Sequence, residues 1–463
     1  MKEKTDRPGD LKLREIATLS IIAVILVTGA ELLNLPTATP HSDALRYIDY
    51  GLNVADHGVF GLSPQDDDEH KRIIPGNANS PLYPLFLAAV FRLSPASAES
   101  MRCLRRAQRS ETIDETPCPM DLGAVVAAQN AVVVAYLVAI GAVTLMLFGR
   151  AWLAYLAPAI VMSSTKPVYF SNLLLTETLL LLGIAVLLLA AAIVVKRRRQ
   201  SGWWLMGAAL AVLTLIRPEY LYLSFFIMAG VLGVALAGWQ RRFAIRGAMV
   251  IAVSFGIVIS PWLARNWSHF GTVRITSGYA DIVLASRAAY NHLSMREWLA
   301  AVVFWIPDVG EKAAATFLDE SAYDRLRDNE TKLRVGGMRD IYAPALTAVD
   351  GDREALVGYL LRHEILGIWH RHLASSLVLA WRGVLASAKY LTIVGLPCLL
   401  VSIYLAFRSR DWAWLCLVAP AVYQVAFYAL TSVSVARYDV FLIFYFSIAI
   451  SWLVDDLLRR RSL

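Results

Sequence analysis

Long runs of apolar residues, each long enough to cross a lipid bilayer, recur along the chain. A transmembrane helix needs about 20 mostly apolar residues. Ten runs meet this need, at 13–34, 121–148, 151–170, 173–195, 202–217, 219–238, 247–263, 386–407, 412–432 and 438–456. A further apolar run at 81–93 is too short to cross, and we expect it to lie at the outer membrane surface or to dip into the bilayer. The pattern predicts an all-α polytopic membrane protein with about ten transmembrane helices.

The composition narrows the class of protein further. Of 463 residues, 57% are apolar and 17% are charged, against about 45–50% and 25% in soluble domains. This excludes a soluble enzyme, a disordered chain and a fibrous repeat. In a membrane protein, the net charge of +7 indicates which loops face the cytoplasm. No nucleic-acid partner is expected.

The basic residues indicate how the spans are oriented. With the N-terminus inside, the cytoplasmic segments are 1–14, 149–150, 196–201, 239–246, 408–411 and 457–463. They hold the basic runs at 196–199, 241–242 and 459–461, as the positive-inside rule requires. An even number of spans brings both termini to the cytoplasmic side of the cell inner membrane.

Two segments of roughly a hundred residues then lie outside, far longer than ordinary connections. The chain divides into 1–34 (cytoplasmic N-terminus and first span), 35–120 (first outer loop), 121–263 (spans two to seven), 264–385 (large outer cap) and 386–463 (spans eight to ten and the basic tail). The cap has helix-like pieces near 294–304 and 352–372. Cys103 and Cys118 share the first outer loop, where a disulfide and two free thiols are both open.

The first outer loop begins with a predicted amphipathic helix at 40–61. Ser42 is a suitable N-cap and Gly58 a suitable stop. At 100° per residue the helix has three sectors: Leu45, Ile48, Leu52 and Ala55; Asp43, Tyr47, Tyr50 and Val54; and Asp49, Asn53 and Asp56. The alternatives are a surface helix with a solvated acid and belt tyrosines, or a stripe that serves chemistry.

Charged residues elsewhere in this loop have two interpretations each. Lys71 and Arg72 suggest a phosphate contact or contact with lipid headgroups. The acidic run at 66–70 suggests a divalent metal site or a solvated loop. No cofactor is firmly implied.

Ionisable residues also gather where the predicted spans meet the outer surface. They are Lys166, Glu177, Arg217, Glu219, Arg265, Lys389, Arg437 and Asp439. Any one of them could snorkel to the interface. Because ionisable residues stand at six such boundaries, the pattern favours a polar cavity that is open to the outer leaflet and suits an anionic lipid.

Six short motifs, taken in order, resemble those of the GT-C superfamily of polytopic glycosyltransferases. The similarity is to the branch with bacterial dolichyl-phosphate-mannose-type transferases, protein O-mannosyltransferases and lipid A aminoarabinose transferases. The motifs are Asp43…Tyr47…Ala55…Gly58, the run 81–88, the run 175–179, the run 215–219, the run 261–266 with Phe270-Gly271, and Ala436-Arg437-Tyr438. Two features depart from the family: residues 78–81 replace its usual Arg-Pro-Pro, and the 264–385 segment is longer.

The resemblance implies a GT-C-type helix bundle with amphipathic outer-surface helices and a periplasmic cap. It implies transfer of a sugar from a polyprenyl phosphate to a lipid, glycan or protein acceptor, with Asp43 as the general base. Glu177 is the second acid, orienting the sugar or the acceptor. The substrate-binding candidates are Tyr47, Tyr50, Lys71, Arg72, Tyr83, Arg217, Glu219, Arg265, Asn266, Lys389, Arg437 and Tyr438.

Two other functions remain open. A polymerase or ligase that uses polyprenyl-diphosphate glycans would also have a large outer loop with arginines. A transporter or lipid flippase would carry charges at mid-span and related half-repeats.

Overall fold

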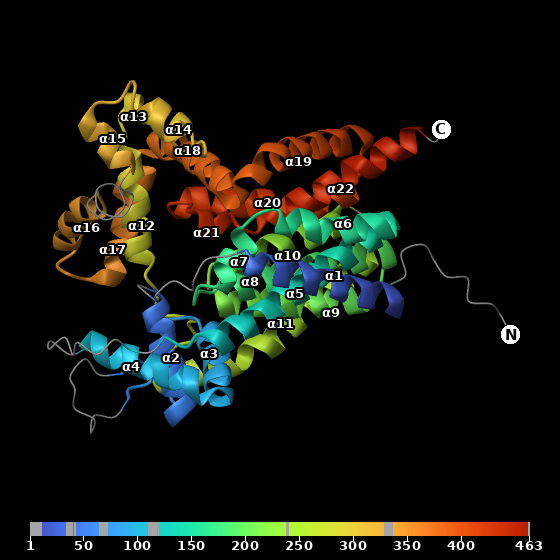
Figure 1. The fold of residues 1–463 in the computed structure, drawn as a ribbon. Helices are drawn as coiled ribbons and strands as arrows, with labels where there is room; N and C mark the ends of the chain where they lie inside the picture. The colour runs from blue at the N-terminus through green and yellow to red at the C-terminus, as the bar shows by residue number, and fades with distance from the viewer. Residues whose placement is uncertain are drawn as a thin grey trace. The chain divides into compact units, whose positions relative to one another are not determined.

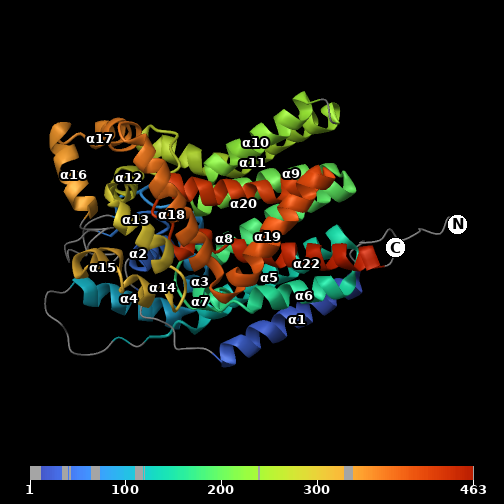
Figure 2. The same ribbon diagram turned by 90° about the horizontal axis from the view of Figure 1, so that it is seen from above.

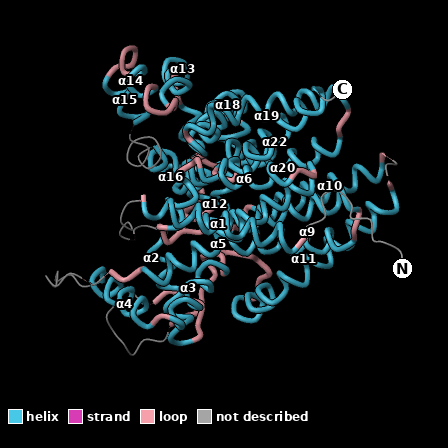
Figure 3. The backbone as a smooth tube through the Cα atoms, turned by 45° about the vertical axis from the view of Figure 1, so that its right-hand side comes forward, coloured by secondary structure: helices cyan, strands magenta, loops and turns pink. Residues whose placement is uncertain are grey.

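The computed structural model describes residues 12–33, 40, 43–63, 73–109, 118, 120–237, 240–327 and 337–461. Every regular element in these residues is a helix (Figure 3). The chain forms two compact units, one of residues 1–277 with 451–463 and the other of residues 278–450. Each is described by itself.

Unit 1 contains the first twelve helical segments. They are α1 (Leu13–Leu32), α2 (Asp43–His57), α3 (Leu82–Leu93), α4 (Pro95–Arg109), α5 (Gly123–Phe148), α6 (Ala151–Met162), α7 (Lys166–Ser171), α8 (Glu177–Ala192), η1 (Ile193–Arg197), α9 (Gln200–Ile216), α10 (Tyr220–Leu236) and α11 (Arg241–Phe270). Packed neighbours run from α1 through α5, α8 and α9 to α11 (Figure 1). Close packing of α9 on α11 needs Gly207, where a Cβ atom would lie 2.5 Å from the Ile251 carbonyl oxygen.

Unit 2 holds shorter helices followed by long ones (Figure 2). They are α12 (Ala280–Ala289), η2 (Tyr290–His292), α13 (Met295–Phe304), α14 (Gly310–Ala314), α15 (Glu320–Arg327), α16 (Gly337–Ala348), α17 (Arg353–Leu360), η4 (Leu361–Leu366), α18 (Trp369–Ala388), α19 (Tyr390–Ser409), α20 (Trp412–Thr431) and α21 (Ala436–Asp439). α22 (Leu442–Arg461) begins in unit 2 and continues past its last residue. α13 starts at a capping box, in which Ser294 accepts from the Glu297 N–H and Glu297 accepts from the Ser294 N–H.

Six helices in the described residues are long and apolar enough to cross a membrane. They are α1, α5, α8 with η1, α11, α19 and α20. These helices are compatible with a multi-pass membrane protein. Three of the other four predicted spans fall on α6 with α7, α9 and α10, whose apolar helices are shorter, and the fourth falls on α22. The count of about ten spans therefore stays a prediction.

The predicted third span is interrupted between α6 and α7. Ser163 Oγ donates to the Ile160 carbonyl oxygen at 2.7 Å, and Ser164 Oγ accepts from the Lys166 N–H at 3.3 Å. Pro167 follows and has no N–H to continue the ladder. Hydroxyl groups that bond locally compete with helix formation, so this apolar run forms two short helices.

Candidate functional site

The helix predicted to begin the first outer loop is α2, and it packs inside unit 1. Ile48 and Leu52 lie in a core with residues of α3, α4 and α5. Tyr47 packs against the same core, and its ring meets that of Tyr83 edge-on at 5.2 Å between centroids. Tyr50 is buried as well. The helix is amphipathic as predicted, but its tyrosines face protein. Asp43 is its first residue and is half-buried.

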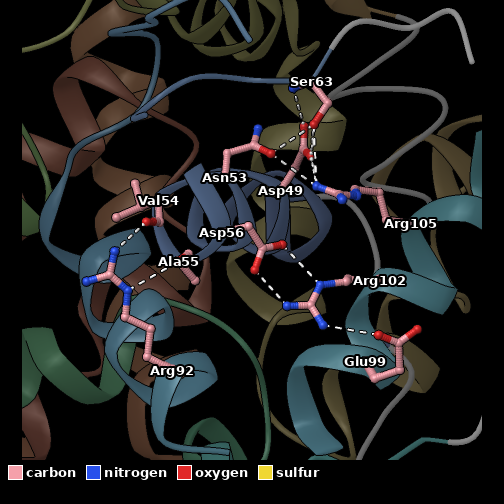
Figure 4. A network of polar contacts seen from close by, with 10 residues as sticks. All are labelled: Asp49, Asn53, Val54, Ala55, Asp56, Ser63, Arg92, Glu99, Arg102 and Arg105. Atoms are coloured by element: carbon pink, nitrogen blue, oxygen red, sulfur yellow. Dashed lines mark hydrogen bonds and ion pairs between the residues drawn. The ribbon is translucent and has the colours of Figure 1, made fainter. Parts of the chain in front are cut away.

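The third sector of α2 enters a polar network (Figure 4). Asp49 accepts hydrogen bonds from the Ser63 N–H at 2.9 Å and from Ser63 Oγ at 2.8 Å. Arg105 Nη1 of α4 donates to Asp49 Oδ1 at 3.3 Å and to Asn53 Oδ1 at 3.1 Å. Asn53 Nδ2 donates to the Gly61 carbonyl oxygen at 2.8 Å. The network fixes the rotation of α2 about its axis and holds the chain that follows it.

A second set of contacts joins the C-terminal end of α2 to α4. Arg102 Nη2 lies 2.6 Å from Asp56 Oδ1 and its Nε 3.0 Å from Oδ2, while its Nη1 reaches Glu99 at 3.1 Å (Figure 4). The hydrogen bond from Arg102 lowers the pKa of Asp56. Cys103 of α4 is disulfide-bonded to Cys118, which decides between the two states that the sequence left open.

Arg265 of α11 holds the loop that follows α2. Its Nη2 donates to the Phe60 carbonyl oxygen and its Nη1 to the Gly76 carbonyl oxygen, both at 2.8 Å. The guanidinium carbon lies 4.8 Å from the Trp262 ring centroid, within the range of a cation–π contact. Asn266 Nδ2 donates to the Arg274 carbonyl oxygen at 2.7 Å. Both residues were predicted to bind substrate, and the structure gives them backbone partners.

The loop that follows α2 also contacts Tyr50. The Tyr50 ring lies 4.5 Å from that of Phe60. Burial raises the pKa of Tyr50, against the lowering effect of Arg46. Arg46 Nη2 in turn donates to Asn79 Oδ1 at 3.0 Å. Arg46 and Tyr50 therefore belong to a part of α2 that is held by the loop at 73–80.

A buried ion pair stands at the start of α8. Glu177 has no exposed surface and Arg217 is 6% exposed. Arg217 Nη2 lies 2.6 Å from Glu177 Oε1, and its Nε donates to Thr176 Oγ1 at 2.9 Å. Arg217 directly follows α9, and Glu219 is the residue before α10. Glu177 and Arg217, which the sequence placed at two separate span boundaries, are thus direct partners.

Tyr83 shares one core with α2 and with the residues around Glu177. Its hydroxyl donates to Gln129 Oε1 of α5 at 3.2 Å, and Gln129 Nε2 donates to the Ser171 carbonyl oxygen at 2.8 Å. Burial raises the pKa of Tyr83 well above its usual value, and the charge of Glu177 adds to the rise. Tyr47 of α2 and Leu175 and Leu179, on either side of Glu177, pack against the core that contains Tyr83. Gln129 was missed because a single amide inside an apolar run carries no signal of its partners.

The other predicted site residues lie elsewhere. Lys71 and Arg72, with the acidic run at 66–70 and Ser42, fall outside the described residues. Lys389 and Tyr438 belong to unit 2. There Lys389 Nζ lies 3.1 Å from Asp308 Oδ1, and the Tyr438 ring stacks on that of Tyr428 at 4.9 Å. Arg437 is half-buried on α21 of the same unit.

Metal-binding chemistry finds no support in the part of the chain that the structure describes. No group of three or more His, Cys, Asp or Glu side chains there could hold a metal ion.

Comparison with protein-family models and with curated protein sequences gives no match to this chain.

Proposed function

We propose that the protein is a GT-C-type membrane glycosyltransferase of about ten spans, with both termini in the cytoplasm. It transfers a sugar from a polyprenyl phosphate to an acceptor hydroxyl at the outer face of the inner membrane. The observation that carries the proposal is the packing of α2 with the residues around the buried pair: Tyr47 contacts Tyr83, and both pack in one core with Leu174, Leu175 and Leu179, on either side of Glu177. Motif residues of α2, of the run 81–88 and of the run 175–179 thus belong to one neighbourhood.

The gain in stability alone does not account for a buried ion pair of this kind. Taking two charges out of water costs several kcal/mol per ion, and an apolar pair of similar volume is often at least as stable. Glu177 and Arg217 are nonetheless nearly inaccessible to water. The pair gives the site an acid in a fixed position, which is the role we assign to Glu177: orienting the sugar or the acceptor.

Asp43 is the proposed general base. Its carboxylate takes the proton of the acceptor hydroxyl as the acceptor oxygen bonds to the anomeric carbon. The bond from that carbon to the phosphate oxygen breaks at the same time, and the polyprenyl phosphate leaves with the electron pair and with inversion at carbon. No general acid is needed, because phosphate is a good leaving group. The described contacts of Arg265 are to backbone oxygens, so Lys71 and Arg72, in the same outer loop as Asp43, are the stronger candidates to stabilise the departing charge.

The test is transfer in proteoliposomes from a polyprenyl-monophosphate hexose, with the corresponding polyprenyl-diphosphate donor in parallel. We expect turnover with the monophosphate only. Asp43→Asn should lower it at least about 100-fold. Asp56→Asn is the matched control on the same helix, since Asp56 pairs with Arg102, and it should stay within about threefold of wild type.

Two results would overturn the proposal. Turnover retained in Asp43→Asn would remove the assigned base, and transfer from the diphosphate alone would indicate a polymerase or ligase. Mass spectrometry of the lipid that co-purifies with the protein would name the sugar to be tried first.

A further inference from the structure

One face of α18 is fixed against the rest of unit 2. Arg287 of α12 is completely buried. Its Nη2 donates to the His372 carbonyl oxygen at 3.0 Å, to Ser375 Oγ at 3.0 Å and to Ser376 Oγ at 2.6 Å. Its Nε donates to the Ala429 carbonyl oxygen of α20 at 2.7 Å. One guanidinium therefore joins three helices and determines which side of α18 faces inward.

A neighbouring face of α18 is apolar and exposed. Leu366 just before the helix is 66% exposed, Trp369 60%, Leu373 49% and Leu377 69%. A spacing of three or four residues puts these side chains in one stripe along a helix. Single exposed apolar residues are ordinary on protein surfaces, but four in a line mark an interaction surface. The stripe belongs to the segment that the sequence assigned to an aqueous outer cap.

α18 is followed directly by a membrane-spanning candidate. α19 begins two residues after α18 ends, and α19 is apolar and long enough to cross a bilayer. Ile393 and Val394 near its start are 65% and 56% exposed. α18 runs across the direction of α20 in unit 2 (Figure 2). A helix with an exposed apolar stripe that crosses the spanning direction suits the membrane surface.

Basic side chains lie at one end of the stripe. Arg362 and His363 of η4, with His370 and Arg371 of α18, are all exposed. The guanidinium groups of Arg362 and Arg371 match lipid headgroups, because the phosphates lie at the border of the hydrocarbon.

We propose that α18 is an interfacial membrane helix, with its stripe of Leu366, Trp369, Leu373 and Leu377 in the acyl chains of the outer leaflet. The occupant of this surface is lipid that is continuous with the lipid around α19. The large outer segment is then anchored by a helix of its own. This anchoring does not depend on the proposed transfer reaction.

The test uses nitroxide spin labels on single cysteines in the full-length protein, reconstituted in phosphatidylcholine–phosphatidylglycerol vesicles. The background carries Cys398→Ser and Cys416→Ser, because these two cysteines are free thiols. Labels go on Leu373→Cys and Leu377→Cys. Ile393→Cys of α19 is the lipid reference, and Ala348→Cys, exposed at the end of α16, is the water reference. Each label's collision rates with oxygen and with a water-soluble nickel chelate are measured.

We expect the oxygen-to-nickel ratio at positions 373 and 377 to match position 393 and to exceed that at position 348 about tenfold. A ratio equal to that at position 348 would place the stripe in water and overturn the proposal. Labels shielded from both agents would also overturn it, because the stripe would then be covered by protein. The Cys398→Ser and Cys416→Ser background without a label site serves as the folding control, and its thermal unfolding is compared with that of each labelled variant.

Discussion

Two buried arginines, Arg217 in unit 1 and Arg287 in unit 2, are accommodated in different ways. Arg217 faces a carboxylate, Glu177, at 2.6 Å. The described hydrogen bonds of Arg287 go to neutral oxygens only, from Asn291, Ser375, Ser376 and two backbone carbonyls. The first arrangement has no net charge, and the second spreads one positive charge over several dipoles.

The difference also affects the neighbours. Burial and the charge of Arg287 lower the pKa of His372 to about 4, so this imidazole stays neutral at physiological pH. The carboxylate of the Arg217 pair instead adds to the rise in the pKa of Tyr83. One arginine joins helices through neutral acceptors, and the other is paired with a buried acid.

The largest effect is expected from removing one partner of the Glu177 pair. Glu177→Gln leaves the Arg217 charge buried without a carboxylate, and we expect the free energy of unfolding to fall by about 3–5 kcal/mol. The measurement is denaturant unfolding in detergent micelles. The double variant Glu177→Gln with Arg217→Met should recover most of the stability but no sugar transfer. A single variant as stable as wild type would show that the pair is not buried in the working protein.

Arg287→Met should destabilise the protein by about 3 kcal/mol, because it leaves several buried acceptors without a donor. Ser376→Ala is the matched control; it removes one acceptor and should cost about 1 kcal/mol. The same unfolding assay measures both. If the two variants lose equal stability, Arg287 does not join the three helices as described.

Arg105→Gln should loosen α4 from α2 at a cost of about 1.5 kcal/mol, since its hydrogen bond to the Asp49 carboxylate is lost. Amide hydrogen exchange should rise in the peptides that cover 43–63. Arg106→Gln is the control, because Arg106 pairs with Glu99 where both side chains are largely exposed, and it should cost under about 0.5 kcal/mol. Unchanged exchange in Arg105→Gln would show that the polar network does not hold α2.

The smallest effect concerns pH. Because the pKa of Asp56 is lowered by Arg102 in the folded state, the stability from this pair is present above the unfolded pKa of about 3.9 and is lost as pH falls through the folded value. Wild type and Arg102→Gln should differ by about 0.5 kcal/mol at pH 6, and the difference should shrink as the pH is lowered below the unfolded pKa, as measured by thermal unfolding. A difference that does not shrink on acidification would exclude the pair as its cause.

Much of the fold could be predicted from apolar run length, because a helix that crosses a bilayer must satisfy its own backbone. Six predicted spans coincide with helices that are long and apolar enough to cross. The third span was predicted as one piece because hydropathy does not register that Ser163 and Ser164 bond to nearby backbone groups. The helix α2 and its polar sector of Asp49, Asn53 and Asp56 were also predicted, but their partners on α4 were not.

The sequence predicted which residues gather at the candidate site, but it predicted their contacts less well. Nothing in a single sequence pairs Glu177 with Arg217, forty residues apart, because that contact depends on how α8 and α9 pack. Arg265 was expected to face a ligand, since a charged side chain at a span end is costly unless it faces a cavity or a partner. The structure satisfies it with the carbonyl oxygens of Phe60 and Gly76, which a hydropathy pattern cannot show.

The bond between Cys103 and Cys118 makes α4 a built-in reporter of sidedness. Disulfides persist in oxidising compartments and are rare in the cytosol. A molecule inserted with α4 toward the cytosol would carry two thiols there, which a maleimide would alkylate without prior reduction. In the Cys398→Ser and Cys416→Ser background, gel mobility after alkylation with and without reductant would therefore distinguish molecules with α4 on the oxidising side from molecules with α4 on the cytosolic side.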